Sequence, residues 1–319
     1  MTATSVLTPD APSVPVPVPD PTVAPSWSER LCTAAIVVIP VAAVAWAAQH
    51  FWHHGIGWFD LVLAAILYAV TGHGIALGFH RLFTHRSFRA HRWLRITLAV
   101  SGSMAMEGSV ISWVSHHRRH HVYSDHPGDP HSPTSFGPGL LPQLRGLGHA
   151  HVGWLFSGTQ SNPEKWSRDL LADRDMVIVS KLTPLWMALT LIVPFGLGWA
   201  VTGSLTGALL ALVWAGGVRI ALLHHVTWSV NSLAHLFGKR PYQTTDHSGN
   251  IAWLALLSFG DSWHNNHHAF PALARHGCDA GQLDSSARLL QLFERMGWAW
   301  KARWPTSAQL ATRRVLPGT

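Results

Sequence analysis

The sequence predicts an all-α integral membrane protein with four transmembrane helices in two hairpins and a cytosolic helical cap. Of its 319 residues, 48% are hydrophobic and only 12% are charged, about half the charged share of an average soluble domain. Four apolar runs approach the length of a membrane crossing. The 23 histidines concentrate beyond the ends of these runs, where they indicate a site in the cap.

The first 28 residues have neither a basic start nor an apolar run. Their Pro, Val and Asp content cannot form a packed core, so they predict a disordered cytosolic tail and not a secretion signal. We expect the membrane domain to cover residues 29–305 and a C-terminal tail to follow at 306–319.

The apolar runs predict membrane spans at residues 31–51, 58–79, 182–201 and 205–223. The first and second spans, and the third and fourth, are joined by very short links without Lys or Arg, which favours hairpins. The opposite ends are basic and therefore predict a cytosolic face, with both termini on that side. These basic residues are Arg81, Arg86, Arg89, Arg92 and Arg95 after the second span, and Lys239 and Arg240 after the fourth.

A fifth apolar stretch covers residues 94–113 but contains Ser, Gly and Glu residues. We expect it to lie along the interface or against the cap. The net charge of +7 comes mainly from arginines beside the apolar runs, which indicates a membrane surface and not a nucleic-acid site. Two cysteines, Cys32 and Cys278, are too few for a disulfide framework or an internal four-thiolate iron–sulfur cluster.

The histidines form three groups. His80 and His85 come at the end of the second span, and two HxxHH units contain His117, His120 and His121, and His264, His267 and His268. On an α-helix the positions i, i+3 and i+4 share one face, so each unit can offer three rings to one metal cluster. His80 and His85 are about 140° apart on a regular helix and can share a site only if the helix ends or bends. Asn231 and His235 add an i, i+4 pair after the fourth span.

Eight histidines in these groups, nine with His235, exceed the three or four ligands of one zinc ion and predict two metals. Imidazole suits Fe, Zn, Cu and Ni, so the element stays open. Neither an HExxH nor a GxSxG motif occurs, which argues against a zinc or serine hydrolase. Asp125, Asp129 and Asp261 are candidates to accept the second ring N–H of ligating histidines.

The segments HRLFTH, HRRHH, NSLAHLFGKRPY and HNNHHAFP occur in this order on the four spans. In this the chain closely resembles the membrane fatty acid desaturases of the acyl-CoA (stearoyl-CoA, Δ9) type, over most of residues 35–300. The resemblance implies a di-iron centre with Asn231 contacting one iron through water. It also implies O2- and two-electron-dependent insertion of a cis double bond into a long acyl chain. The implied histidine ligands are His80, His85, His117, His120, His121, His235, His264, His267 and His268.

The resemblance further implies an acyl tunnel between the second and fourth spans. Tyr68 precedes His80 by 12 residues, about 18 Å along a helix, and either caps the methyl end of the chain or simply packs. Trp113 matches a tryptophan of the family. Arg118 and Arg119 are expected to bind carrier phosphates, although Ser115 and His116 replace the Arg-Asp pair of animal acyl-CoA desaturases.

No haem-binding HPGG segment of a fused cytochrome b5 occurs, so we expect a separate ferredoxin, flavin reductase or cytochrome as electron donor. Its expected docking face is basic and comprises Arg86, Arg89, Arg92, Arg95 and Arg275. The preference for Arg over Lys, and for Ala and Gly, indicates a bacterial cell membrane. Two alternatives stay open: a di-iron fatty acyl or alkane hydroxylase on the same scaffold, and a histidine-rich membrane protein that binds or transports metal.

Overall fold

The computed structural model describes residues 20, 25–158 and 160–315. Most of the predicted N-terminal tail lies outside these residues. The described chain is mainly helical, and four of its helices are long and apolar enough to cross a membrane. They are Trp27–His54, Trp58–Thr84, Thr183–Thr202 and Leu205–His235, which agree in position with the four predicted spans.

The first two long helices follow each other closely. Helix α1 (Trp27–His54) begins with a capping box between Ser26 and Glu29 and ends at Gly55, whose φ of 73° suits glycine. Only 11% of its most apolar window is buried, so its side chains face outward as a lipid contact requires. Helix α2 (Trp58–His73) continues directly as the π-helix η1 (Gly74–Thr84).

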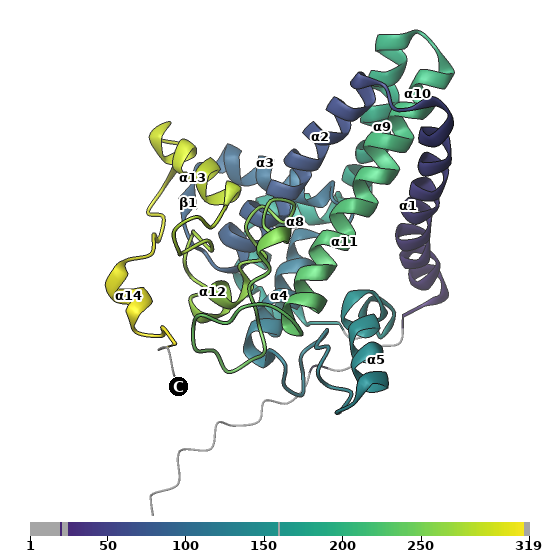
Figure 1. Ribbon diagram of the computed structural model, residues 1–319. Coiled ribbons are helices and arrows are strands. Elements are labelled where there is room, and N and C mark those ends of the chain that lie inside the picture. Colours follow the sequence, from purple (N-terminus) through teal and green to yellow (C-terminus); the bar gives the residue numbers. More distant parts are fainter. Residues whose placement is uncertain (1–19, 21–24, 159, 316–319) are drawn as a thin grey trace, which may run out of the picture.

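The other pair is joined just as tightly. Helix α9 (Thr183–Thr202) ends at the left-handed Gly203, and α10 (Leu205–Ala211) starts two residues later. A Cβ on Gly198 would lie 2.6 Å from the Cβ of Ala211, so the two helices need glycine to approach this closely. The second helix continues through η3 (Leu212–Val218), α11 (Arg219–Ser232) and η4 (Leu233–His235). Figure 1 shows both short links at one end of the molecule, away from α4 and α12.

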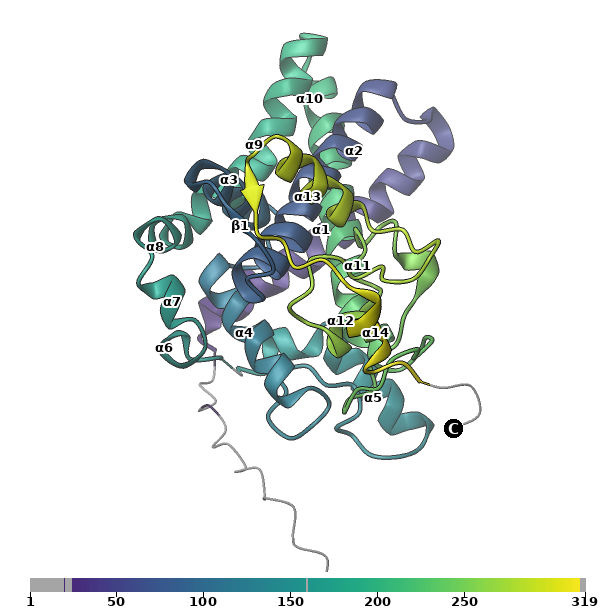
Figure 2. The same cartoon turned by 90° about the vertical axis from the view of Figure 1, so that its left-hand side faces the viewer.

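Shorter elements gather at the opposite end of the long helices (Figure 2). A two-residue antiparallel ladder pairs β1 (Arg89–Ala90) with β2 (Ala299–Trp300). The helices here are α3 (Arg92–Ser103), α4 (Val110–Tyr123), α5 (Leu140–His151), η2 (Gly153–Phe156), α6 (Pro163–Trp166), α7 (Arg168–Leu171), α8 (Arg174–Lys181), η5 (Ala252–Leu254), α12 (His264–Ala269), α13 (Ser285–Arg295) and α14 (Ser307–Ala311). The last of these lies within the predicted C-terminal tail.

The fifth apolar stretch forms α3, a turn and the start of α4. Helix α3 has 12 residues, too few to cross a bilayer, which agrees with the prediction that this stretch does not span. It packs against η1 so closely that a Cβ on Gly74 would meet the backbone N of Gly102 at 2.2 Å. The turn contains Met106 with a φ of 63°, and His224 of α11 donates to the carbonyl of Ala105 at 2.8 Å. This turn is therefore anchored to the fourth long helix.

Candidate metal centre

The first histidine pair is brought together by the π-helix η1. Its hydrogen bonds link residues five apart, and the backbone N of His85 donates to the carbonyl of His80 at 3.1 Å. Five residues thus make about one turn, and the two ring centroids lie 4.9 Å apart. The sequence predicted that the two rings could share a site only if the helix ends or bends between them. The structure confirms this, because η1 ends at Thr84, one residue before His85, and its wider winding helps to align the two rings.

The two HxxHH units are helical, as predicted, and the structure divides each of them between two sets of rings. His117 and His121 of α4 join one set and His120 the other; in α12, His264 and His268 are separated from His267 in the same way. We call the sets the five-histidine group and the four-histidine group, and the ligand atoms within each lie within 4.8 Å of one another. Their members are His80, His85, His117, His121 and His267, and His120, His235, His264 and His268.

Within each group the ring nitrogens converge. The Nε2 atom of His267 lies 3.0 Å from that of His80 and 2.9 Å from that of His121. In the four-histidine group the Nε2 atoms of His235 and His264 are 2.9 Å apart. Two nitrogens bound at right angles to one cation, each at about 2.1 Å, lie about 3.0 Å apart.

Buried carboxylates accept from the opposite side of four of these rings. The predicted acceptors are confirmed: Asp261 lies 3.0 Å from Nδ1 of His80, Asp129 3.0 Å from His120, and Asp125 2.8 Å from His235. The sequence missed Asp246, 2.6 Å from Nδ1 of His268, because it lies in an irregular loop at no fixed spacing from any histidine. Burial alone would raise the pKa of all four carboxyls, but the adjoining histidines hold each pKa well below its usual range.

These contacts fix which ring nitrogens carry protons. A histidine that donates from Nδ1 to a carboxylate presents an Nε2 lone pair, so the Nε2 atoms of His80, His120, His235 and His268 are free to bind a cation. Burial, followed by the neighbouring histidines, lowers the pKa values of His117, His121, His264 and His267 and keeps these rings neutral, the form that binds metal. The Nε2 atoms of His85, His120 and His268 are buried without a hydrogen-bond partner. Both groups therefore fit a metal ion.

The two asparagines between the histidines of α12 face away from the metal groups. Asn265 exchanges hydrogen bonds with the backbone of Tyr242 at 2.9 and 3.0 Å. Asn266 donates to the carbonyl of His276 at 2.8 Å. They fix the short helix in place and so orient its three histidines.

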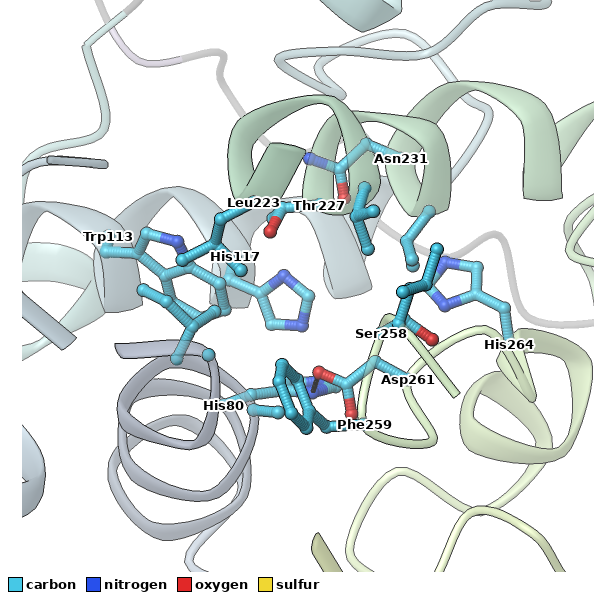
Figure 3. A pocket seen from close by; sticks show the side chains of 16 residues that line it. His80, Trp113, His117, Leu223, Thr227, Asn231, Ser258, Phe259, Asp261 and His264 are labelled. Atoms are coloured by element: carbon cyan, nitrogen blue, oxygen red, sulfur yellow. Dashed lines mark hydrogen bonds and ion pairs between the residues drawn. The ribbon is translucent and has the colours of Figure 1, made fainter. Parts of the chain in front are cut away.

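Two adjoining and mainly apolar pockets, together called the cavity, lie beside the metal groups. Its outer part, about 220 Å³, lies between α1, the α3–α4 turn, α4, η2 and α11, and its inner part, about 30 Å³, lies between η1, α11 and residues 257–261. The two parts share Trp113, His117, Thr227 and Asn231. Figure 3 shows Trp113 and His117 facing His264 across the inner part. Asn231 lines both parts of the cavity, and its water-mediated contact to a metal stays a prediction.

The comparison with known protein families decides what this arrangement is. The sequence model of the family "Fatty acid desaturase" matches residues 56–304, which contain all nine histidines of both groups.

The chain belongs to the fatty acid desaturase family.

Individual relatives cover most of this desaturase. It is 37% identical over 280 residues to a hex-5-enoyl-[acyl-carrier protein] acetylenase of Moorena producens, with 87% of each chain covered. It is 36% identical over 261 residues to an sn-1 stearoyl-lipid 9-desaturase of Anabaena variabilis, covering 81% of this chain and 86% of the relative. It is 36% identical over 260 residues to Delta-9 acyl-lipid desaturase 1 of Arabidopsis thaliana, covering 79% and 78%. The desaturase is thus an oxidoreductase that acts on fatty acyl chains, in a family that uses two irons.

The structure places the predicted substrate residues unevenly. Trp113 lines the cavity and its indole N–H donates to Glu107 at 3.2 Å. Tyr68 is not among the residues that line the cavity; its hydroxyl donates to the carbonyl of Leu257 at 2.8 Å, and its ring contacts Phe259. Phe259 lines the inner part of the cavity and fills the space that a side chain at Gly72 would need. Phe259, and not Tyr68, therefore meets the cavity.

The two arginines expected to bind phosphate are engaged elsewhere. Arg118 donates to the carbonyl of Phe83 at 2.7 Å and to the carboxylate of Asp169 at 2.6 Å. Arg119 is 3% exposed and donates to the carbonyl of Gly128 at 2.8 Å. Arg118 thus holds the end of η1 and α7 against α4, and Arg119 holds the loop at Gly128.

The basic surface of this desaturase is also largely neutralised. Arg86 pairs with Asp169 at 2.6 Å, and Arg92 pairs with Asp175 at 2.7 Å. Arg95 pairs with Asp173. The expected docking face for an acidic donor thus has three of its five arginines in intramolecular pairs, which lowers its net charge.

The sequence also missed Glu107, which lines the outer cavity. Burial raises its pKa to about 7, against the opposing hydrogen bonds from Thr227 and Trp113. One carboxyl oxygen is buried without a partner. A single glutamate in an apolar stretch carries no pattern that marks it as part of a cavity wall.

Proposed function

We propose that this desaturase inserts a cis double bond, at the Δ9 position, into a long saturated acyl chain at two irons held by the nine histidines. The observation that carries the proposal is the pair of converging imidazole groups beside an apolar cavity. The names of the two lipid 9-desaturase relatives support the position of the bond. When bound, the irons supply the O2- and two-electron-dependent removal of two hydrogens from adjacent methylenes.

The protein's own part is to hold the ligands and the chain. Buried carboxylates orient one ring of the five-histidine group, His80, and three of the four-histidine group, His120, His235 and His268. The cavity wall of Trp113, Leu223, Val226 and Phe259 is mostly apolar and keeps water away from an acyl chain that has no polar handle of its own. Holding the reacting methylenes beside the metal site lowers the entropic cost of reaching the reactive orientation.

We propose a lipid-linked acyl chain as substrate, in preference to the acyl-CoA expected from the sequence. The intramolecular contacts of Arg118 and Arg119 leave no arginine of the second histidine box for a CoA phosphate. The outer part of the cavity is lined by α1 and α4, and α1 is a candidate membrane span with an exposed apolar surface. A lipid-linked chain can enter along such a surface without leaving the bilayer.

We propose that the histidine groups lie on the cytosolic side of a bacterial cell membrane, with both termini. Two short links without Lys or Arg lie at one end of the long helices (Figure 1). The basic residues lie at the other end, which the positive-inside rule assigns to the cytosol. A separate redox protein on that side would supply the electrons.

A second candidate is an acetylenase, which converts an existing double bond to a triple bond. The relative of that name is 37% identical over 87% of this chain. Its named substrate is bound to acyl-carrier protein, which would reach the cytosolic side from solution.

The test uses the iron-loaded protein in vesicles with a reductant system and O2. It is given stearoyl-lipid, stearoyl-CoA or hex-5-enoyl-acyl-carrier protein, and the products are analysed by mass spectrometry. We expect an oleoyl chain from the stearoyl-lipid. Alkyne from the hexenoyl substrate alone supports the acetylenase, and hydroxylated chains without new alkene contradict both in favour of a hydroxylase. Bound zinc without O2 consumption would favour a metal-binding or transport protein.

A further inference from the structure

One buried arginine lies next to the metal groups. Arg81 follows the ligand His80 in η1 and is fully buried. Its guanidinium lies 3.0 Å from Asp261, the carboxylate that accepts from His80, and 3.2 Å from Asp284. It also donates to Nδ1 of His276 at 3.1 Å. A positive charge thus sits one carboxylate away from a ring of the five-histidine group.

The partners of Arg81 are themselves held by hydrogen bonds to the backbone. Asp284 caps α13 by accepting from the backbone N of Ala287 at 2.9 Å, and it accepts from the backbone N of His276 at 2.7 Å. The ring of His276 lies against that of His267, with centroids 4.4 Å apart. These contacts place the charges of Arg81 and Asp284 beside the five-histidine group.

The four-histidine group has a different electrostatic environment. Its rings are backed by Asp125, Asp129 and Asp246, and no Lys or Arg forms an ion pair with these three carboxylates in the part of the chain that the structure describes. The partners around the four-histidine group therefore carry three negative charges. Those around the five-histidine group carry two, from Asp261 and Asp284, and one positive charge from Arg81.

We propose that Arg81 makes the two metal sites electrostatically unequal, so that the iron in the five-histidine group is the easier of the two to reduce. This rests on the proposed di-iron centre. A nearby cation stabilises the ferrous over the ferric ion, and three carboxylates without a Lys or Arg ion pair do the opposite. Electrons from a donor would then reside first on the five-histidine iron. Arg81 acts through Asp261 and His80 as a positioning and charge-setting residue and touches neither substrate nor reacting atoms.

The test is a reductive titration of the full-length iron-57 protein, followed by Mössbauer spectroscopy. Wild-type protein should reduce in two one-electron steps. Arg81→Gln should lower the potential of the first step, with at least a tenfold change in the ratio of oxidised to reduced iron, about 59 mV for one electron. Arg81→Lys, which keeps the positive charge, should restore the wild-type potential of the first step. Asp284→Asn, which keeps the oxygen that caps α13, should raise the potential of the first step, whereas Asp125→Asn should raise the potential of the second step.

A merely structural role of Arg81 would not shift the potential of the first step in opposite directions in Arg81→Gln and Asp284→Asn. If Arg81→Gln does not fold, Asp284→Asn and Asp125→Asn decide between the two accounts. If the wild-type protein binds two irons but the variants leave the potentials unchanged, or shift them with the reverse signs, this inference alone is overturned. A wild-type protein that takes up no iron overturns this inference and the proposed function together.

Discussion

Replacing Asp125 with asparagine removes one buried charge from the four-histidine group while keeping its shape. One carboxyl oxygen accepts from Nδ1 of His235 at 2.8 Å and from the backbone N of His247 at 2.9 Å. The other accepts from the hydroxyls of Ser132 and Thr134 at 3.0 and 3.3 Å. An asparagine can keep its oxygen toward His235, because its NH2 group can donate to the two hydroxyls instead. Asp125→Asn therefore tests the charge behind His235.

We expect this change to weaken metal binding at the four-histidine group by about 10- to 100-fold, the usual effect of losing a carboxylate behind a ligating histidine. This corresponds to about 1.4–2.7 kcal/mol. The assay is a competition titration of metal-free protein with Fe2+ and a chromophoric chelator. The wild-type affinity of the five-histidine group serves as internal reference and should not change.

Asp175→Asn is the matched control, because Asp175 forms an exposed pair with Arg92 and surface pairs contribute little. Equal affinities in Asp125→Asn and the control would refute the reasoning that His235 is a ligand whose orientation and basicity depend on the carboxylate. Weakening at both histidine groups would refute the assignment of His235 to one of them.

Three further changes address the ligands, the cavity and its buried acid. His267→Ala should reduce the iron content from about two to about one per chain and abolish product, as measured by elemental analysis and mass spectrometry; an unchanged iron content would rule out His267 as a ligand. Phe259→Ala should open the inner cavity and shift the products toward longer acyl chains, whereas Tyr68→Phe should leave the product lengths unchanged. Unchanged products in Phe259→Ala and altered product lengths in Tyr68→Phe would indicate that Tyr68 caps the methyl end of the acyl chain. Burial raises the pKa of Glu107 from 4.5 to about 7, so the folded state holds this proton more tightly and loses stability as pH rises from 4.5 through 7. Glu107→Gln should therefore raise the unfolding temperature more at pH 8 than at pH 5. The corresponding difference in the free energy of unfolding is up to about 3 kcal/mol, and an equal shift in unfolding temperature at both pH values would contradict the raised pKa.

The long helices and the histidine units could be predicted from the sequence because hydropathy and helical spacing act locally. The second and fourth helices extend beyond their predicted ends, to Thr84 and His235, since they continue into the protein interior, where hydropathy no longer sets the boundary. Asp125, Asp129 and Asp261 could be proposed as acceptors because they lie close in sequence to histidine groups.

Other features depend on contacts that no local pattern records. The π-helix η1 that aligns His80 with His85 has no residue signature of its own. The division of each HxxHH unit between two groups follows from the packing of α4 against α12. Asp246 and Glu107 meet the site from irregular segments, and the engagement of Arg118 is set by Asp169, 51 residues away.

The most direct test of the account is the amount of alkene formed per chain in a single turnover, measured as a function of bound iron. Reduced protein with graded iron loading would be exposed to O2 in vesicles containing stearoyl-lipid, and the new double bonds would be counted by mass spectrometry. The account predicts that alkene appears in proportion to chains that hold two irons and is absent from chains with one. Alkene that rises in proportion to the first iron, or none at full loading, would contradict it.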